Sequence, residues 1–109
     1  MILSRYLVFK VEGQRITREN PSELIVAGTY GYFKAKFLFS SDWDGYQKVA
    51  GFYTKHGKEL PPKEISSENT CEIPKEALEL HEFTIKLFGK DNGRFITTKP
   101  ISIIQYGGK

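Results

Sequence analysis

The sequence has one cysteine and two histidines among 109 residues, and no long hydrophobic run. Cys71 stands alone, so no intrachain disulfide can form, which argues against a disulfide-stapled secreted domain and favours folding in a reducing compartment. No apolar stretch approaches the length of a membrane-spanning helix, so we expect no membrane segment. Arg5 interrupts the apolar start of the chain after a few residues, so we expect no secretory signal. These features predict a soluble chain that folds in a cytoplasm.

The chain has no large excess of charge of either sign. The chain carries 16 basic and 13 acidic residues, a net charge of +3, which permits contact with an anionic polymer but does not require it. Nucleic acid is therefore not the partner that we expect. His56 and His81 have no Cys or His neighbour at metal-ligand spacing, and the glycines form no phosphate-binding loop. The sequence predicts no enzyme, no metal site and no cofactor.

Aromatic residues are abundant, at 14% of the chain, and apolar residues alternate with polar ones, as in β-strands. The length predicts one domain, residues 1–109. The longest alternation covers residues 30–40. One of its faces is apolar, consisting of Phe33, Ala35, Phe37 and Phe39, and is predicted to be core. The other face is half polar, consisting of Tyr32, Lys34, Lys36 and Leu38, and is predicted to be solvated or to bind a partner.

Shorter runs with strand composition occur along the rest of the chain. They cover residues 6–11, 14–18, 24–27, 49–55, 63–66, 70–73, 83–87, 94–98 and 101–106. Asn92-Gly93 predicts a hairpin turn, whereas Pro61-Pro62 excludes regular strand pairing there. Pro74 suits the first position of a short helix near residues 75–80, about two turns long. Residues 107–109 are interpreted as a tail or the start of a linker. We therefore predict an all-β fold, an antiparallel β-sandwich or a partly open barrel with one short helix.

The Asp-Trp-Asp-Gly segment is the first candidate for chemistry. Asp42 and Asp44 could act as paired carboxylates in acid–base or glycosidic chemistry. The interpretation that we favour is a turn, in which the Asp side chains bond local backbone N–H groups and Gly45 takes a positive φ. Trp43 is predicted to be core rather than a ligand platform. Cys71 could pair with an imidazole, but an inert buried thiol is the favoured interpretation.

Two binding hypotheses rest on aromatic residues. Tyr30, Tyr32, Lys34 and Lys36 interleave rings and bases on one strand, as a single-strand nucleic-acid-binding barrel requires, and Lys86, Phe88 and Arg94 could extend that face. The favoured interpretation is a solvated sheet face, whose lysines also deter edge-to-edge pairing. The second hypothesis is a carbohydrate-binding module that holds host-wall glycans with the rings of Tyr30, Tyr32, Tyr46 and Tyr53.

Several short motifs follow one another along the chain in a fixed order. They are F-x-F-S-x-D-W-D-G at 37–45, K-x-A-x-F at 48–52, C-x-I-P-x-E-x-L at 71–78, F-x-I-x-L-F-G at 83–89 and T-T at 97–98, followed by an apolar strand and Gly107. Over residues 30–108 this order resembles the small β-sandwich domain of baseplate and tail proteins from phages of Gram-positive hosts, often found at the N-terminus of upper-baseplate or receptor-binding components. The structural signature comprises Phe37, Phe39, Asp42, Trp43, Asp44, Gly45, Phe52, Pro74, Phe83, Gly89, Thr97 and Thr98.

The resemblance implies a bacteriophage structural protein without catalysis. It implies a tail or baseplate component that acts through protein–protein contacts in virion assembly or host attachment, and that resides in the virion after assembly in the bacterial cytoplasm. Its implied partners are other tail and baseplate proteins, with a second copy of the chain or a host-wall glycan as further candidates. In this interpretation the core is formed by Phe37, Phe39, Trp43, Phe52, Phe83, Ile85 and Leu87.

Overall fold

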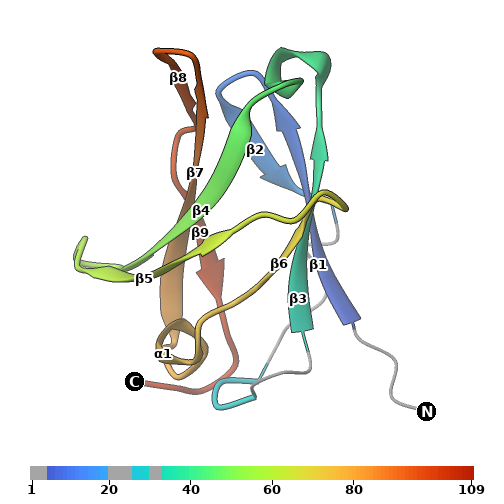
Figure 1. Ribbon diagram of the computed structural model, residues 1–109. Helices are drawn as coiled ribbons and strands as arrows, with labels where there is room; N and C mark the ends of the chain where they lie inside the picture. Colours follow the sequence, from blue (N-terminus) through green and yellow to red (C-terminus); the bar gives the residue numbers. More distant parts are fainter. Residues whose placement is uncertain (1–4, 20–25, 30–32) are drawn as a thin grey trace.

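The computed structural model describes residues 5–19, 26–29 and 33–109 (Figure 1). The strands in this part are β1 (Arg5–Glu12), β2 (Arg15–Arg18), β3 (Phe33–Phe39), β4 (Gln47–Thr54), β5 (Glu59–Glu64), β6 (Thr70–Glu72), β7 (Glu82–Asp91), β8 (Arg94–Thr97) and β9 (Ile101–Ile104). A 3-10 turn, η1 (Ser41–Trp43), follows β3, and one short helix, α1 (Lys75–Leu78), precedes β7. Half of the strand expected at 24–27 lies outside the described residues, and within the other half Val26 forms an isolated bridge with Tyr106.

The strands form two sheets that pack face to face (Figure 1). The first has the order β2-β1-β3-β6, and the second has the order β5-β4-β7-β8, with β9 also paired to β7. The predicted all-β sandwich with one short helix is confirmed, and within the described part the sheets do not close into a barrel.

One strand pair differs from the predicted antiparallel arrangement. β1 and β3 run parallel, in a register from Arg5–Phe33 to Val11–Phe39, whereas the other pairs of labelled strands are antiparallel. Parallel neighbours need a crossover rather than a tight turn. Here β2 returns beside one edge of β1, and the chain then crosses back so that β3 joins the other edge in the direction of β1.

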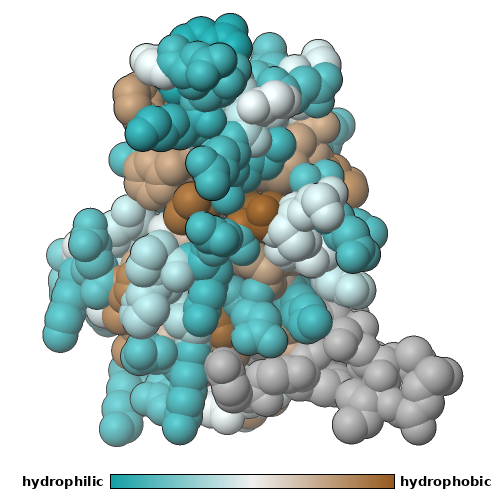
Figure 2. Space-filling model, in the orientation of Figure 1, coloured by the Kyte–Doolittle hydropathy of each residue, from teal (hydrophilic) through white to brown (hydrophobic). Residues whose placement is uncertain are grey.

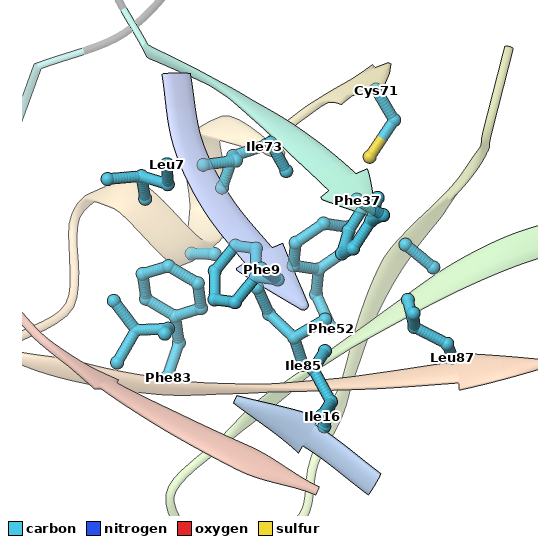
Figure 3. Close-up of a cluster of buried hydrophobic side chains, with 14 of the residues drawn as sticks. Leu7, Phe9, Ile16, Phe37, Phe52, Cys71, Ile73, Phe83, Ile85 and Leu87 are labelled. Carbon is cyan, nitrogen blue, oxygen red and sulfur yellow. The ribbon is translucent and has the colours of Figure 1, made fainter. Parts of the chain in front are cut away.

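The core lies between the two sheets (Figure 3). The inward positions of both sheets supply its fully buried side chains, among them Leu7, Phe9, Phe37, Phe52, Phe83, Ile85 and Leu87. Phe9 of β1 and Phe37 of β3 stack with their ring centroids 5.5 Å apart, and this contact stabilises the pairing of the two parallel strands. Phe39, expected in the core, is only half-buried because it lies at the end of β3.

β5 contradicts the expectation that Pro61-Pro62 prevents strand pairing. The two prolines lie within this strand, which pairs with β4 on both sides of them. Ala50 faces Lys63 and Phe52 faces Leu60, so two prolines stand opposite the single residue Gly51 in a β-bulge. Because β5 is the edge strand of its sheet, prolines that lack an N–H donor are tolerated there.

The C-terminal residues are not the tail that we expected. Lys109 donates its N–H to the Glu79 carbonyl (3.3 Å) and accepts from the N–H of His81 (3.1 Å). A Cβ added at Gly108 would lie 2.7 Å from the backbone of Leu80 and His81, so this glycine permits the close approach. Residues 107–109 therefore dock on the segment between α1 and β7.

Gln105 fixes the C-terminal end of α1. Its buried Nε2 donates to the carbonyls of Ala77 and Leu78, at 3.2 Å each, and to that of Leu80. The carbonyls of Ala77 and Leu78 belong to the last turn of α1, where a helix leaves carbonyls without partners further along the helix. The helix is also shorter than expected, four residues long, and Pro74 is its N-cap rather than its first residue. Such a short helix depends on tertiary contacts, and Gln105 supplies them.

Candidate functional site

The Trp43 turn, which follows β3, is hydrogen-bonded to the β1–β2 hairpin. Trp43 is fully buried, and its indole Nε1 donates to the Gly13 carbonyl at 2.8 Å. The Gly13 N–H in turn donates to the Ser40 hydroxyl (3.2 Å), which donates to the Asp42 carboxylate (3.0 Å). The hydrogen bonds link positions about 30 residues apart in the sequence. We call this group of Gly13, Ser40, Asp42 and Trp43 the tryptophan clasp.

The two aspartates do not act as we expected. Asp42 accepts from the Ser40 side chain rather than from a backbone N–H, and within the described part the Asp44 carboxylate has no hydrogen bond. The expected positive φ at Gly45 is present, at +82°. The prediction about the Asp side chains was therefore wrong, because the Asp42 carboxylate accepts from the Ser40 hydroxyl, while the N–H groups of Trp43 and Asp44 donate to backbone carbonyls of the turn. Asp42 supports the clasp and Asp44 is exposed.

Gly89 of β7 receives the indole ring of Trp43. A Cβ added at Gly89 would lie 2.9 Å from Cζ3 of Trp43 and 2.8 Å from Cγ2 of Ile96. No real side chain tolerates such distances, so glycine is the residue that lets the ring lie against the sheet. The Trp43 ring also contacts Phe39, with ring centroids 5.2 Å apart. One indole thus joins both sheets and the β1–β2 turn.

Thr98 bonds to β7 at Leu87, between the part of β7 that pairs with β8 and the part that pairs with β9. Its N–H donates to the Leu87 carbonyl (3.1 Å), and its hydroxyl accepts from the Leu87 N–H (3.0 Å). It thereby bridges β8 and β9, which pair with opposite ends of β7. Thr97 pairs with Phe88 at the end of β8. Both threonines have structural roles in this arrangement.

Reactive groups are dispersed in the described part of the chain. No three His, Cys, Asp or Glu side chains among these residues lie close enough to hold a metal ion. His56 is exposed, and Nδ1 of His81 lies 2.9 Å from the Gly107 carbonyl. Cys71 is buried on β6 opposite Ala35. The pKa of the Cys71 thiol is raised to about 12, mainly because the thiol is buried. The positive charge of Lys63 lowers this pKa and the negative charge of Glu72 raises it.

The raised pKa predicts how the thiol responds to pH. At pH 8 the Cys71 thiol of the folded protein should remain protonated and react with a disulfide reagent at least tenfold more slowly than the unfolded chain does, because the thiolate is the nucleophile. The shift also stabilises the folded state below a pH of about 9, and this contribution is lost as the pH rises toward 12. Thiol titration with and without urea measures the first effect. Equal rates in both states would contradict it, and Cys71→Ser is the reagent blank.

The predicted partner face is described only in part. Tyr30 and Tyr32 lie outside the described residues. Lys34 is half-buried and Lys36 is exposed on the outer face of the first sheet, where Nζ of Lys36 lies 5.7 Å from the ring centroid of Tyr6. In the strand register, Lys34 faces Glu72. This face therefore has mixed charge, and the single-strand nucleic-acid hypothesis stays a prediction.

The two described tyrosines of the glycan hypothesis, Tyr46 and Tyr53, lie in different surroundings. Tyr46 packs edge-on against Trp43, with centroids 6.3 Å apart, and the Arg94 guanidinium lies 5.5 Å from its ring centroid. Tyr53 lies instead on the outer face of the second sheet, facing Thr84 in the register. The two rings therefore do not form one cluster. Figure 2 shows hydrophobic side chains near the middle of the face in view, with hydrophilic ones above and below.

A hollow that sequence reasoning missed lies over Gly51 on the outer face of β4. It has a volume of about 220 Å³ and is lined mainly by apolar groups, including those of Val49, Pro62 and Phe88. A Cβ at Gly51 would lie 2.9 Å from both the Phe88 ring and the Tyr53 hydroxyl, so the glycine lets these two rings lie over the sheet. We call this feature the Gly51 hollow. Partial burial, with Glu59 as the second cause, raises the pKa of Tyr53.

The sequence matches no protein-family model, and no curated protein matches it significantly. The resemblance of residues 30–108 to phage baseplate domains therefore stays a prediction that depends on the motifs alone. None of the helices in the described part is long and apolar enough to cross a membrane.

Proposed function

We propose that this chain is a non-enzymatic structural subunit of a phage tail or baseplate, acting through protein–protein contacts in assembly or host attachment. The observation that carries the proposal is the use of the signature residues. Trp43 and Gly89 hold the sheets together, and Thr98 bridges two strands, so the motif residues specify a scaffold rather than a reactive site. The motif resemblance supplies the assignment to phage particles.

The described surface offers apolar residues suited to protein contact. Phe95 is 73% exposed at the β7–β8 hairpin, and Tyr106 is 71% exposed beside the exposed side chains of Val26 and Ile104. Exposed apolar groups that adjoin one another are typical of interaction surfaces. The proposed subunit would use such surfaces to contact neighbouring particle proteins.

Mass spectrometry of gradient-purified particles, from a phage or induced prophage that encodes the chain, tests this function. We expect the chain at a fixed ratio to the major tail proteins, because a structural subunit occupies defined positions. A phage replication protein expressed at the same time serves as the negative control. Absence of the chain from intact particles, despite its expression in the infected cells, would refute the proposal.

A further inference from the structure

Three hollows on the second sheet share lining residues with one another, and we call them together the trough. The Gly51 hollow shares Tyr53 with a second hollow of about 310 Å³, which is also lined by Thr84 and Lys86. The second hollow shares Lys86 and Pro100 with a third of about 290 Å³. The trough therefore crosses the strands from β5 over β4 and β7 to the segment between β8 and β9, instead of following a strand edge.

The second and third hollows are positively charged. Lys55 and Lys86 line the second, Lys86 and Lys99 line the third, and no acidic side chain of the described residues lines either one. Among these residues no carboxylate pairs with the three ammonium groups; Nζ of Lys86 lies 5.6 Å from the Phe88 ring centroid. Lysines that line neighbouring hollows without a carboxylate partner attract an anionic group, such as a sulfate, a phosphate or a carboxylate.

The remaining lining groups suit the polar edges and the apolar face of a sugar. Tyr53, Thr54 and Thr84 are among the residues that line the second hollow, and hydroxyl groups of such residues can donate and accept hydrogen bonds. The Gly51 hollow beside it is bounded by the Tyr53 and Phe88 rings and has Glu59 in its wall. A ligand that spans both hollows must therefore carry a negative charge at the Lys86 end and an uncharged ring with hydroxyl groups at the Gly51 end.

We propose that this trough binds an acidic glycan, with negatively charged substituents beside Lys86 and its neighbours, Lys55 in the second hollow and Lys99 in the third, and with a neighbouring sugar ring in the Gly51 hollow. The proposal stands independently of the structural role proposed above. It uses Tyr53 of the earlier glycan hypothesis but relocates the site to the outer face of β4 and β7.

Two other polyanions fit the trough less well. A single-stranded nucleic acid carries a phosphate on every nucleotide and would bring one next to Glu59. An acidic peptide that lies across the strands would find no free strand edge for its backbone N–H and C=O groups, which need partners when buried. An acidic glycan has spaced charges and hydroxyl groups throughout, so it avoids both costs.

Calorimetric titration of the intact chain at low salt tests the proposal, with a defined sulfated tetrasaccharide and its desulfated form as probes. We expect the sulfated form to bind at least about tenfold more tightly, because charge-assisted hydrogen bonds are the stronger ones. Lys86→Gln should weaken this binding about tenfold or more. Lys90→Gln is the matched control, because Lys90 lies on the same strand, outside the trough, with its Nζ 5.8 Å from the ring centroid of Phe95.

Three outcomes would overturn the proposal. The first is no measurable binding of the sulfated tetrasaccharide, and the second is an equal loss in Lys86→Gln and Lys90→Gln, which would indicate unspecific charge attraction. The third is tighter binding of an eight-residue oligothymidylate or an octaglutamate peptide. Tyr53→Leu provides a second check, since it should weaken saccharide binding several-fold while unchanged thermal unfolding shows that the fold is intact.

Discussion

Replacing Trp43 with alanine is expected to lower the free energy of unfolding by about 4 kcal/mol. The indole is fully buried, and the substitution would leave a cavity between the sheets and remove the donor to the Gly13 carbonyl. Domains of this size have a total stability of roughly 5–15 kcal/mol, so the variant should be close to unfolding at 37 °C. Urea unfolding followed by far-ultraviolet circular dichroism measures the loss.

Two further variants separate the contributions of the indole. Trp43→Phe keeps a ring in the core but removes the Nε1 donor, and should cost about 1–3 kcal/mol because the Gly13 carbonyl loses its partner. Phe95→Ala removes an exposed aromatic ring, 73% accessible, and should change stability by no more than about 0.5 kcal/mol. If Trp43→Ala cost no more than Phe95→Ala, the tryptophan clasp would not stabilise the fold.

Replacing Gly89 with valine is expected to destabilise the domain by about 3 kcal/mol, in spite of the high β-propensity of valine. The new Cβ would meet the Trp43 ring at 2.9 Å and Ile96 at 2.8 Å, in a region where the indole is held by its hydrogen bond and cannot retreat. Lys90→Val, at the next position on the same strand, is exposed and should be nearly neutral. Thermal and urea unfolding of both variants provide the comparison.

A double-mutant cycle tests whether Trp43 causes the clash at Gly89. Gly89→Ala alone should cost about 1–3 kcal/mol. In a Trp43→Phe background it should cost at least about 0.5 kcal/mol less, because phenylalanine lacks the indole ring that carries Cε3 and Cζ3, the two atoms nearest the new Cβ. Strict additivity of the two substitutions would show that Gly89 is required for another reason.

The parts of the fold that depend on neighbouring residues could be predicted from the sequence. Alternation identified the inward faces of β3 and β7, because side chains of a strand point alternately to its two faces. Asn92-Gly93 identified the β7–β8 hairpin, in which both residues take positive φ values of 44° and 81°. Pro74 identified the start of α1 to within one residue.

The parts that depend on distant residues could not be predicted. The bond from Trp43 to Gly13 spans 30 positions, and the parallel pairing of β1 with β3 depends on a crossover that no local pattern encodes. The three lysines of the trough come from three separate segments, so only the sheet topology shows that they line neighbouring hollows. One signal was available, because Gly51 and Gly89 are isolated glycines within strand patterns, which indicate close approach of other groups.

The bulged edge at Pro61-Pro62 has a consequence for crowding. In any setting where many copies are held side by side, bare strand edges tend to fuse into continuous sheets and then into insoluble aggregates. Two of the six residues of β5 have no N–H to offer, and the bulge disturbs the spacing of the rest. A neighbouring copy therefore finds no regular template on this side of the second sheet. The two prolines, which argued against a strand in the sequence, thus protect the strand edge. Many copies of the domain can lie side by side without edge-to-edge aggregation through β5.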